Sequence, residues 1–211
     1  IPGRPLAYWM PPKLLNSLAT LPTFSAAGGT VQFGFSTKDD FRFLRLAWEI
    51  DPPLIGIDRK WVFLSKGGEF SPYYFDIHLL VNHQLDFREL EAALLVKYPY
   101  LGATADWILH RENQYGRSGI TFQRRTNKPM APRVLPEGCF FSDNGPTAFW
   151  QGYDNWLTLA VFNSVVARLL AAIANGSLEA EGGGGANSYE AGIIANVVVP
   201  ASDWDSQRAV K

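Results

Sequence analysis

The chain has 211 residues, of which 47% are hydrophobic, 14% aromatic and only 18% charged, a composition that excludes a disordered, highly charged segment. Its single cysteine excludes an internal disulfide, and no group of Cys and His residues has the spacing of zinc ligands. The net charge of -1 conceals an asymmetry: residues 1–133 carry 16 Lys and Arg against 12 Asp and Glu, whereas residues 134–211 carry 3 against 8. A polyanion would therefore meet the first part of the chain.

The start of the chain predicts how the polypeptide is divided into segments. Four of the first twelve residues are proline and the first residue is Ile1, so we expect a segment of a longer polypeptide. Residues 1–29 are interpreted as a linker or arm from an upstream domain, residues 30–200 as one domain and residues 201–211 as a tail. No apolar run reaches the length of about 18 residues that spans a membrane, and no signal-peptide layout is present. We therefore expect a cytoplasmic protein with no membrane partner.

The first expected elements are a helix, a strand and a second helix. Residues 13–19 predict a short helix after the proline-rich start. Residues 30–35 predict a half-buried strand, because large apolar residues alternate with smaller or polar ones. A longer helix is expected to begin at Thr37, whose side chain can act as N-cap with Asp40 three residues on, and to end before Pro52.

The middle of the chain predicts a strand at residues 60–64, a turn at residues 66–68 and a helix at residues 86–98. Three apolar residues in the polar and basic segment that follows are expected on strands: Trp107, Ile120 and Phe122.

The last third predicts a strand at residues 138–141 followed by a turn at residues 142–146. The strongest helical pattern covers residues 155–174, and Asn163-Ser164 can split it in two. A glycine run at residues 182–185 is expected to form a flexible connection, and residues 193–199 a buried strand.

No catalytic or cofactor site is evident. Residues 51–54, Asp-Pro-Pro-Leu, resemble the loop with which amino-methyltransferases hold the target base, but Leu54 stands where an aromatic ring stacks, and no glycine-rich cofactor loop accompanies it. His78, His83 and His110 fit neither a metal site nor a catalytic pair. Cys139 lies in an apolar stretch and is expected to be a buried structural thiol. We expect no catalytic residue, no cofactor and no metal in this chain.

Three segments have the chemistry of nucleic-acid contacts. Residues 121–128 contain most of the side chains that bind phosphates and base edges, among them Gln123, Arg124, Arg125, Asn127 and Lys128. A second segment, Ser36, Thr37 and Lys38 followed by Arg42, adds a helix N-terminus that can hold a phosphate. In the third, Lys66, Gly67 and Gly68, backbone amides can approach a polyanion.

These residues also carry a resemblance to a known family. The sequence resembles the target-recognition domain at the C-terminal side of large adenine-specific DNA methyltransferases, including the BREX phage-defence (phage growth limitation) methylases and the related single-chain type IIG restriction-modification enzymes. Six stretches carry the resemblance, in one order: residues 34–45 with Trp48-Glu49, 60–69, 119–122, 133–146, 162–166 and 189–194.

The resemblance implies an α/β recognition module with twisted mixed β-sheets and several helices, similar to the recognition domains of type I specificity subunits. It implies double-stranded DNA as the partner, and an upstream methyltransferase domain of the parent chain that binds S-adenosylmethionine and methylates adenine. On this basis Thr37, Lys38 and Arg42 are expected to position phosphates. Residues 66–68 are expected to contact the DNA backbone, and the five side chains of residues 123–128 named above to contact base edges and phosphates.

Two alternatives remain open. The chain can instead be a protein-interaction or structural domain whose tryptophan-rich surface docks a partner subunit, which the acidic second half favours. It can also be a complete small enzyme with a divergent site around Asp51-Pro52-Pro53, which would bind S-adenosylmethionine by itself.

Overall fold

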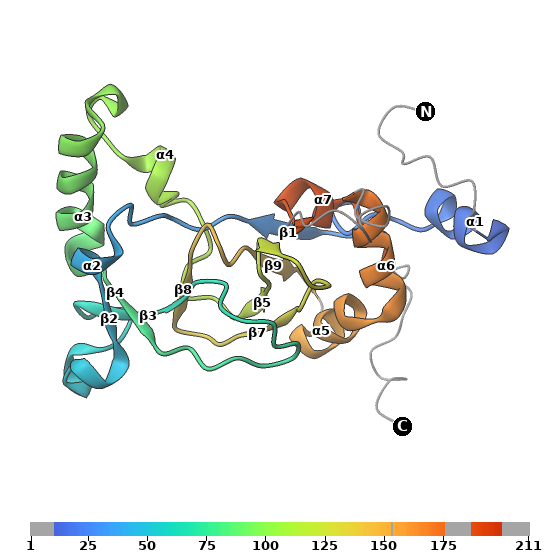
Figure 1. Cartoon of the computed structure of the whole chain (residues 1–211), viewed down its shortest axis with the longest axis horizontal. Helices are drawn as coiled ribbons and strands as arrows, with labels where there is room; N and C mark the ends of the chain where they lie inside the picture. The colour runs from blue at the N-terminus through green and yellow to red at the C-terminus, as the bar shows by residue number, and fades with distance from the viewer. Residues whose placement is uncertain (1–10, 153, 176–186, 200–211) are drawn as a thin grey trace.

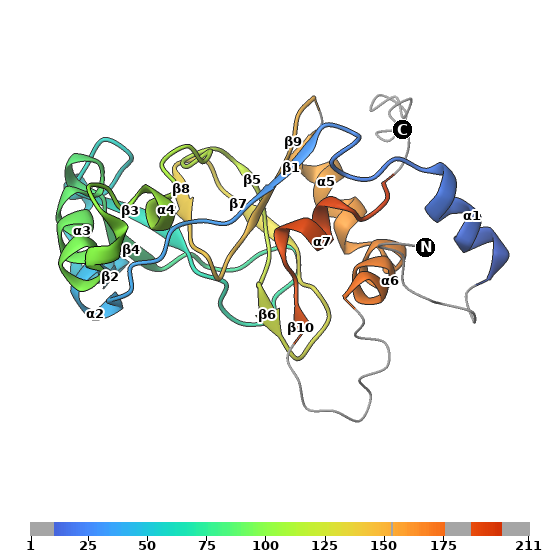
Figure 2. The same ribbon diagram turned by 90° about the horizontal axis from the view of Figure 1, so that it is seen from above.

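In the computed structural model, which describes residues 11–152, 154–175 and 187–199, the chain forms two four-stranded sheets and a two-stranded ribbon. The two sheets lie one after the other along the long axis of the molecule (Figure 1). Helices cover the outer end of each sheet, and the two-stranded ribbon projects to one side, next to the sheet that contains β5 (Figure 2). The fold is thus mixed α/β with several helices and twisted, mostly antiparallel sheets, as the resemblance implies.

The first sheet is entirely antiparallel and packs on the last helices of the chain. Its strand order is β1 (Gly29–Gln32), β9 (Thr147–Trp150), β5 (Gly119–Thr121) and β7 (Arg133–Leu135). The helices are α5 (Asn155–Asn163), α6 (Val165–Ala174) and α7 (Ala191–Ala195). The buried ring of Phe24 packs edge-to-face against both Trp150 and Phe162, which fixes these helices on the sheet.

The second sheet contains one parallel pair. Its order is β2 (Leu44–Leu46), β4 (Leu79–Asn82), β3 (Trp61–Ser65) and β8 (Cys139–Phe141), with β3 and β8 parallel. Apolar residues of these strands share a core with α3 (Gln84–Lys97) and α4 (Asp106–Leu109). Only three residues separate β7 in the first sheet from β8 in the second, so the chain passes directly from one sheet to the other.

A small third core lies at this coupling. Leu135, Cys139, Phe141 and Phe149 come from both sheets and are all buried. Gly34 passes so close to the Phe141 carbonyl that a Cβ there would overlap the backbone. The crossing of two backbones without a side chain between them therefore requires glycine at this position.

The remaining elements are short. They are α1 (Pro12–Thr20), α2 (Asp40–Phe43), β6 (Arg125–Thr126), β10 (Asn187–Ser188) and three 3₁₀ turns at Ala47–Glu49, Pro52–Leu54 and Pro99–Leu101. The strands β6 and β10 pair antiparallel and form the ribbon.

Most of the predicted elements are confirmed. The structure contains the expected helices at residues 13–19, 86–98 and 155–174, the last divided at Ser164, and the expected strands near residues 30–35, 60–64 and 138–141. The predicted glycine connection at residues 182–185 lies outside the described residues.

Three predictions of secondary structure are wrong. The helix predicted from Thr37 to Pro52 ends at Phe43, because residues 44–46 pair with β4 and the Arg45 guanidinium donates to the Phe41 and Leu44 carbonyls. Of the residues predicted on strands, Trp107 lies on α4 and Phe122 follows the end of β5. Residues 191–195 form the helix α7, and only Val198 of the predicted last strand makes a β-bridge, to Thr23.

No helix within the described ranges is by itself long and apolar enough to cross a membrane. Only α5 and α6 taken together pass a test of length and composition, and they are bent by 66° at the break between them.

Candidate nucleic-acid interface

The three predicted contact segments, although far apart in sequence, meet around the turn at residues 142–145. The amide of Asp143 donates to the Phe35 carbonyl (3.0 Å), and the amide of Ser142 donates to the Ser65 carbonyl (3.0 Å). The Arg124 amide donates to the Asn144 carbonyl (3.1 Å). The turn thus binds the residue just before each of the first two segments and one residue within the third. It holds the three segments close together.

In the first segment, Asp39 rather than Thr37 caps α2. Its carboxylate accepts a hydrogen bond from the Arg42 amide (3.2 Å), while the buried Thr37 hydroxyl donates to Asp40. Lys38 is exposed and has a left-handed backbone (φ 53°), and its carbonyl accepts from the Lys97 ammonium (2.8 Å). The predicted cap was therefore wrong by two residues, but the segment presents Lys38 to solvent.

The first and second segments are joined by an ion pair between Lys66 and Asp40. Burial raises the pKa of the Asp40 carboxyl, but hydrogen bonds from Lys66 and Thr37 outweigh this and hold the pKa below its usual value. Gly67 and Gly68 both have positive φ, of 84° and 72°. Since a left-handed pair is costly for other residues, the two glycines let the loop turn away immediately after β3.

The third segment contains two side chains that point inward. Gln123 is buried, and its amide donates to the Gly68 carbonyl (3.1 Å). The Arg124 guanidinium binds both oxygens of the Glu190 carboxylate (3.1 Å each) and lies 4.7 Å above the ring of Phe33. These contacts hold the base of the segment against the body of the protein.

The outer part of the third segment is open to solvent. Arg125 begins the β6/β10 ribbon, which projects from one side of the molecule (Figure 2). Arg125, Asn127 and Lys128 are all exposed, and the Lys128 ammonium lies 5.4 Å from the ring of Phe70.

The twelve predicted contact residues thus divide by exposure. Lys38, Arg42, Gly68, Arg125, Asn127 and Lys128 are exposed; Ser36, Lys66 and Arg124 are half-buried; Thr37, Gly67 and Gln123 are buried. Carboxylates pair with three of the cations, since Arg42 also meets Glu89 (3.4 Å). Lys38, Arg125 and Lys128 form no ion pair within the described ranges, although the charge of Arg125 helps to lower the pKa of Glu190.

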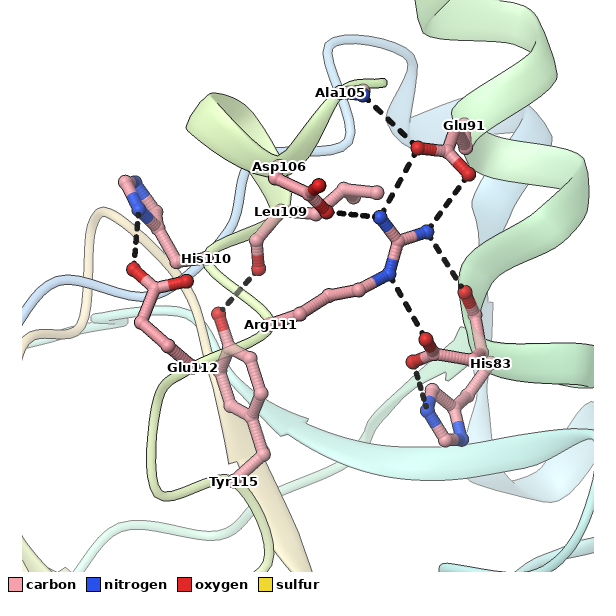
Figure 3. A network of polar contacts seen from close by, with 10 residues as sticks. His83, Glu91, Ala105, Asp106, Leu109, His110, Arg111, Glu112 and Tyr115 are labelled. Carbon is pink, nitrogen blue, oxygen red and sulfur yellow. Dashed lines mark hydrogen bonds and ion pairs between the residues drawn. The ribbon is translucent and has the colours of Figure 1, made fainter. Parts of the chain in front are cut away.

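Arg111 from the same basic stretch of sequence is not part of this surface. Its guanidinium binds Glu91, Asp86 and Asp106, while His83 lies beside Asp86 (Figure 3). Hydrogen bonds from Arg111 hold the pKa of the Glu91 and Asp106 carboxyls below their usual values. Arg111 is one of the 16 Lys and Arg residues counted in residues 1–133, but it ties α3 to α4.

Arg133 is a second arginine whose position the sequence analysis missed. It is 1% exposed, donates to the Glu69 carbonyl (3.0 Å) and lies over the Phe75 ring. The apolar neighbours of Arg133 in sequence, Ala131-Pro132 and Val134-Leu135, were the available signal of burial.

Cys139 and residues 51–54 were the other residues considered for a chemical role. Burial raises the pKa of the Cys139 thiol to about 11, which suits a structural thiol. The Asp51-Pro52-Pro53-Leu54 stretch is exposed and forms a 3₁₀ turn. Across the described residues, no three His, Cys, Asp or Glu side chains are grouped so that they could hold a metal ion.

Comparison with known proteins finds a similarity to part of a methyltransferase. No family model matches the chain. The chain is 24% identical over 172 residues to the adenine-specific methyltransferase BrxX of Escherichia coli O9:H4 (strain HS), and the match covers 77% of this chain but only 12% of BrxX. This similarity supports a distant relation between the chain and one part of a methyltransferase.

Proposed function

We propose that this chain is the DNA target-recognition module of a larger adenine-specific DNA methyltransferase that acts in phage defence or restriction-modification. The catalytic domain, with its S-adenosylmethionine, would lie elsewhere in the parent chain. The module would hold double-stranded DNA so that the catalytic domain can extrude and methylate one adenine.

The observation that carries the proposal is the convergence of the three contact segments on the turn at residues 142–145. It places Lys38, the glycine loop and the ribbon with Arg125 and Lys128 on one framework. Cations without carboxylate partners are the groups that bind phosphates, and an exposed amide beside them, as at Asn127, can read a base edge. The similarity to one part of BrxX supports the same assignment.

Binding to labelled duplex DNA at about 50 and 200 mM salt tests the proposal, because phosphate contacts make affinity fall steeply with salt. The variant Arg125→Ala/Lys128→Ala is expected to bind less tightly and with a salt slope smaller by about one per lost phosphate contact. Arg59→Ala/Lys60→Ala removes the same charge from an exposed turn outside the three segments and serves as the control.

Equal losses in the two double variants would contradict the assignment, because they would show attraction by net charge alone. Within the parent enzyme, Asn127→Ala is expected to change the methylated sequence, whereas Lys38→Ala is expected to weaken methylation of all sequences alike.

A second candidate function, docking of a partner protein, has one observation in its favour. Trp156, Val165 and Val166 on α5 and α6 expose 68%, 83% and 54% of their surfaces. Large apolar side chains exposed on successive helices can belong to a protein interface. Salt-independent binding to the methyltransferase domain, lost in Trp156→Ala/Val165→Ser, would favour docking by this face.

A further inference from the structure

A buried arginine without a carboxylate partner lies beneath the loop that follows β3. The Arg133 guanidinium donates to the Glu69 carbonyl and lies 4.6 Å from the centroid of the Phe75 ring. Its Nε and Nη2 atoms are buried and have no hydrogen-bond partner within the described part of the chain. Burial lowers the pKa of Arg133 to about 10, and the side chain remains charged at neutral pH.

Gln123 has a similar arrangement at the preceding residue of the loop. Its amide nitrogen donates to the Gly68 carbonyl, next to the Glu69 carbonyl that Arg133 holds, and its Oε1 atom is buried with no hydrogen-bond partner among the described residues. Buried polar groups are nearly always hydrogen-bonded, since leaving them unpaired costs free energy. We take these three unpaired atoms, on two side chains that hold neighbouring carbonyls of one loop, as the sign of a ligand site.

The chemistry of the unpaired atoms selects the ligand. The Nε and Nη2 atoms form one side of the planar guanidinium fork, which matches two oxygens of a phosphate group. A ligand anion would also supply the negative charge that the surroundings of Arg133 lack. Gln123 Oε1 can accept a hydrogen bond from a hydroxyl or amino group attached to the same ligand.

A route to Arg133 passes the ring of Phe75. This ring lies over the guanidinium, and it also lines a cleft of about 290 Å³ whose charged lining residues are Lys66, Glu69 and Asp76. Phe75 is only half-buried, and the loop leaves β3 through the two left-handed glycines. Displacement of one ring would therefore connect the cleft with the unpaired nitrogens.

We propose that Arg133 and Gln123 form a concealed phosphate-binding site that opens when Phe75 is displaced. The site is argued from the structure alone. Its assignment to a phosphate of the DNA backbone rests on the proposed function.

Thermal unfolding of the whole chain in phosphate and in chloride buffers of equal ionic strength tests the site. Phosphate is expected to raise the Tm of the wild type by roughly 2–4 °C, a shift that Arg133→Met abolishes. In chloride, Arg133→Met is expected to unfold at the same or a higher temperature, because it removes an unpaired buried charge. Arg168→Met is the matched control, since Arg168 also has a buried, unpaired Nε, on α6, and should keep the phosphate shift.

An arginine that only packs would give a lower Tm in Arg133→Met and the same phosphate shift as in the wild type, and this result would overturn the proposal. If Arg133→Met fails to fold, Phe75→Ala replaces it. This variant keeps the guanidinium and removes the ring in front of it, so it should show a larger phosphate shift than the wild type. Equal phosphate shifts in the two proteins would overturn the proposal as well.

Duplex DNA identifies the source of the phosphate. If Arg133→Met loses both the phosphate shift and several-fold duplex affinity, the site takes a backbone phosphate. If it loses only the phosphate shift, the site takes a small phosphorylated molecule. If the wild type shows no phosphate shift but binds duplex with steep salt dependence, the concealed site is wrong and the proposed function stands.

Discussion

Arg111 binds both carboxylate oxygens of Glu91, with Nη1 3.0 Å from Oε1 and Nη2 2.9 Å from Oε2 (Figure 3). Glu91 Oε1 also accepts from the Ala105 amide (3.0 Å), and Arg111 Nε lies 2.9 Å from Asp86. One guanidinium thus links α3 with the segment that begins α4. Because the side chains of Arg111 and Glu91 are only 24% and 22% exposed, water screens this pair less than it screens a surface ion pair.

Arg111→Met is expected to destabilise the protein by roughly 2–3 kcal/mol, because it leaves partly buried carboxylates without their main hydrogen-bond donor. Chemical denaturation measures the free energy of unfolding. Arg117 is an exposed arginine that donates to the Gln114 side chain, so Arg117→Met is the control and should change that free energy by less than about 0.5 kcal/mol. Equal effects in the two variants would contradict the role of Arg111 as a clamp.

The same network predicts how stability depends on pH. The Glu91 and Asp106 pKa values lie below their usual 4.5 and 3.8, mainly through hydrogen bonds from Arg111, so the stabilisation is present above those values and is lost as the pH falls below them. Burial lowers the pKa of His83 below 6.5, against the opposing effect of Asp86. The unfolded chain therefore takes up the His83 proton first, and stability should begin to fall below about pH 6.5.

The Tm is accordingly expected to fall in two stages on acidification, and calorimetry across this range measures it. His83→Gln should remove the first stage and leave the second. If the first stage persists in His83→Gln, another titrating group causes it.

The sequence predicts those elements whose signals are local. The division of the long helix at Ser164 is an example, since the Ser164 hydroxyl accepts from the Ala167 amide (3.1 Å) and caps α6 at the point where Asn163-Ser164 interrupts the apolar pattern. The Lys66-Gly67-Gly68 turn is another, because two glycines with positive φ are what such a turn requires.

What the sequence could not predict depends on distant partners. Residues 44–46 have a helical pattern, yet they form a strand because β4, more than 30 residues away, supplies their hydrogen-bond partners. The positive charge of Arg124 is likewise offset by Glu190, 66 residues further along the chain. Local composition thus located the candidate interface but overestimated its free positive charge.

Glu190→Gln tests whether Arg124 can contribute to DNA binding once it is released. Hydrogen bonds from Ser188 and Arg124 outweigh the effect of burial and hold the Glu190 pKa below its usual value, so the residue is charged at neutral pH. Removing this charge should weaken the pair, lower the Tm and raise duplex affinity several-fold with a steeper salt slope. Glu112→Gln removes the same charge from an exposed carboxylate that lies 3.6 Å from His110. Equal gains in affinity would show that net charge, and not Arg124, is responsible.

Gly34 and Phe141 cross so closely that a substitution at Gly34 is expected to destabilise the protein strongly. A Cβ at residue 34 would overlap the Phe141 carbonyl, which cannot retreat because β8 pairs with β3 at Ser65. Gly34→Ala should therefore cost at least about 3 kcal/mol, at the upper end of what overpacking usually costs. Gly192→Ala on α7 is the control, since its Cβ would meet nothing within 4 Å and alanine favours a helix by up to about 1 kcal/mol.

Because Phe35 next to Gly34 accepts the hydrogen bond from Asp143, any Gly34→Ala protein that still folds should bind DNA less tightly than its stability alone would explain. Normal duplex affinity in such a protein would show that the turn at residues 142–145 need not hold the first segment in place for binding.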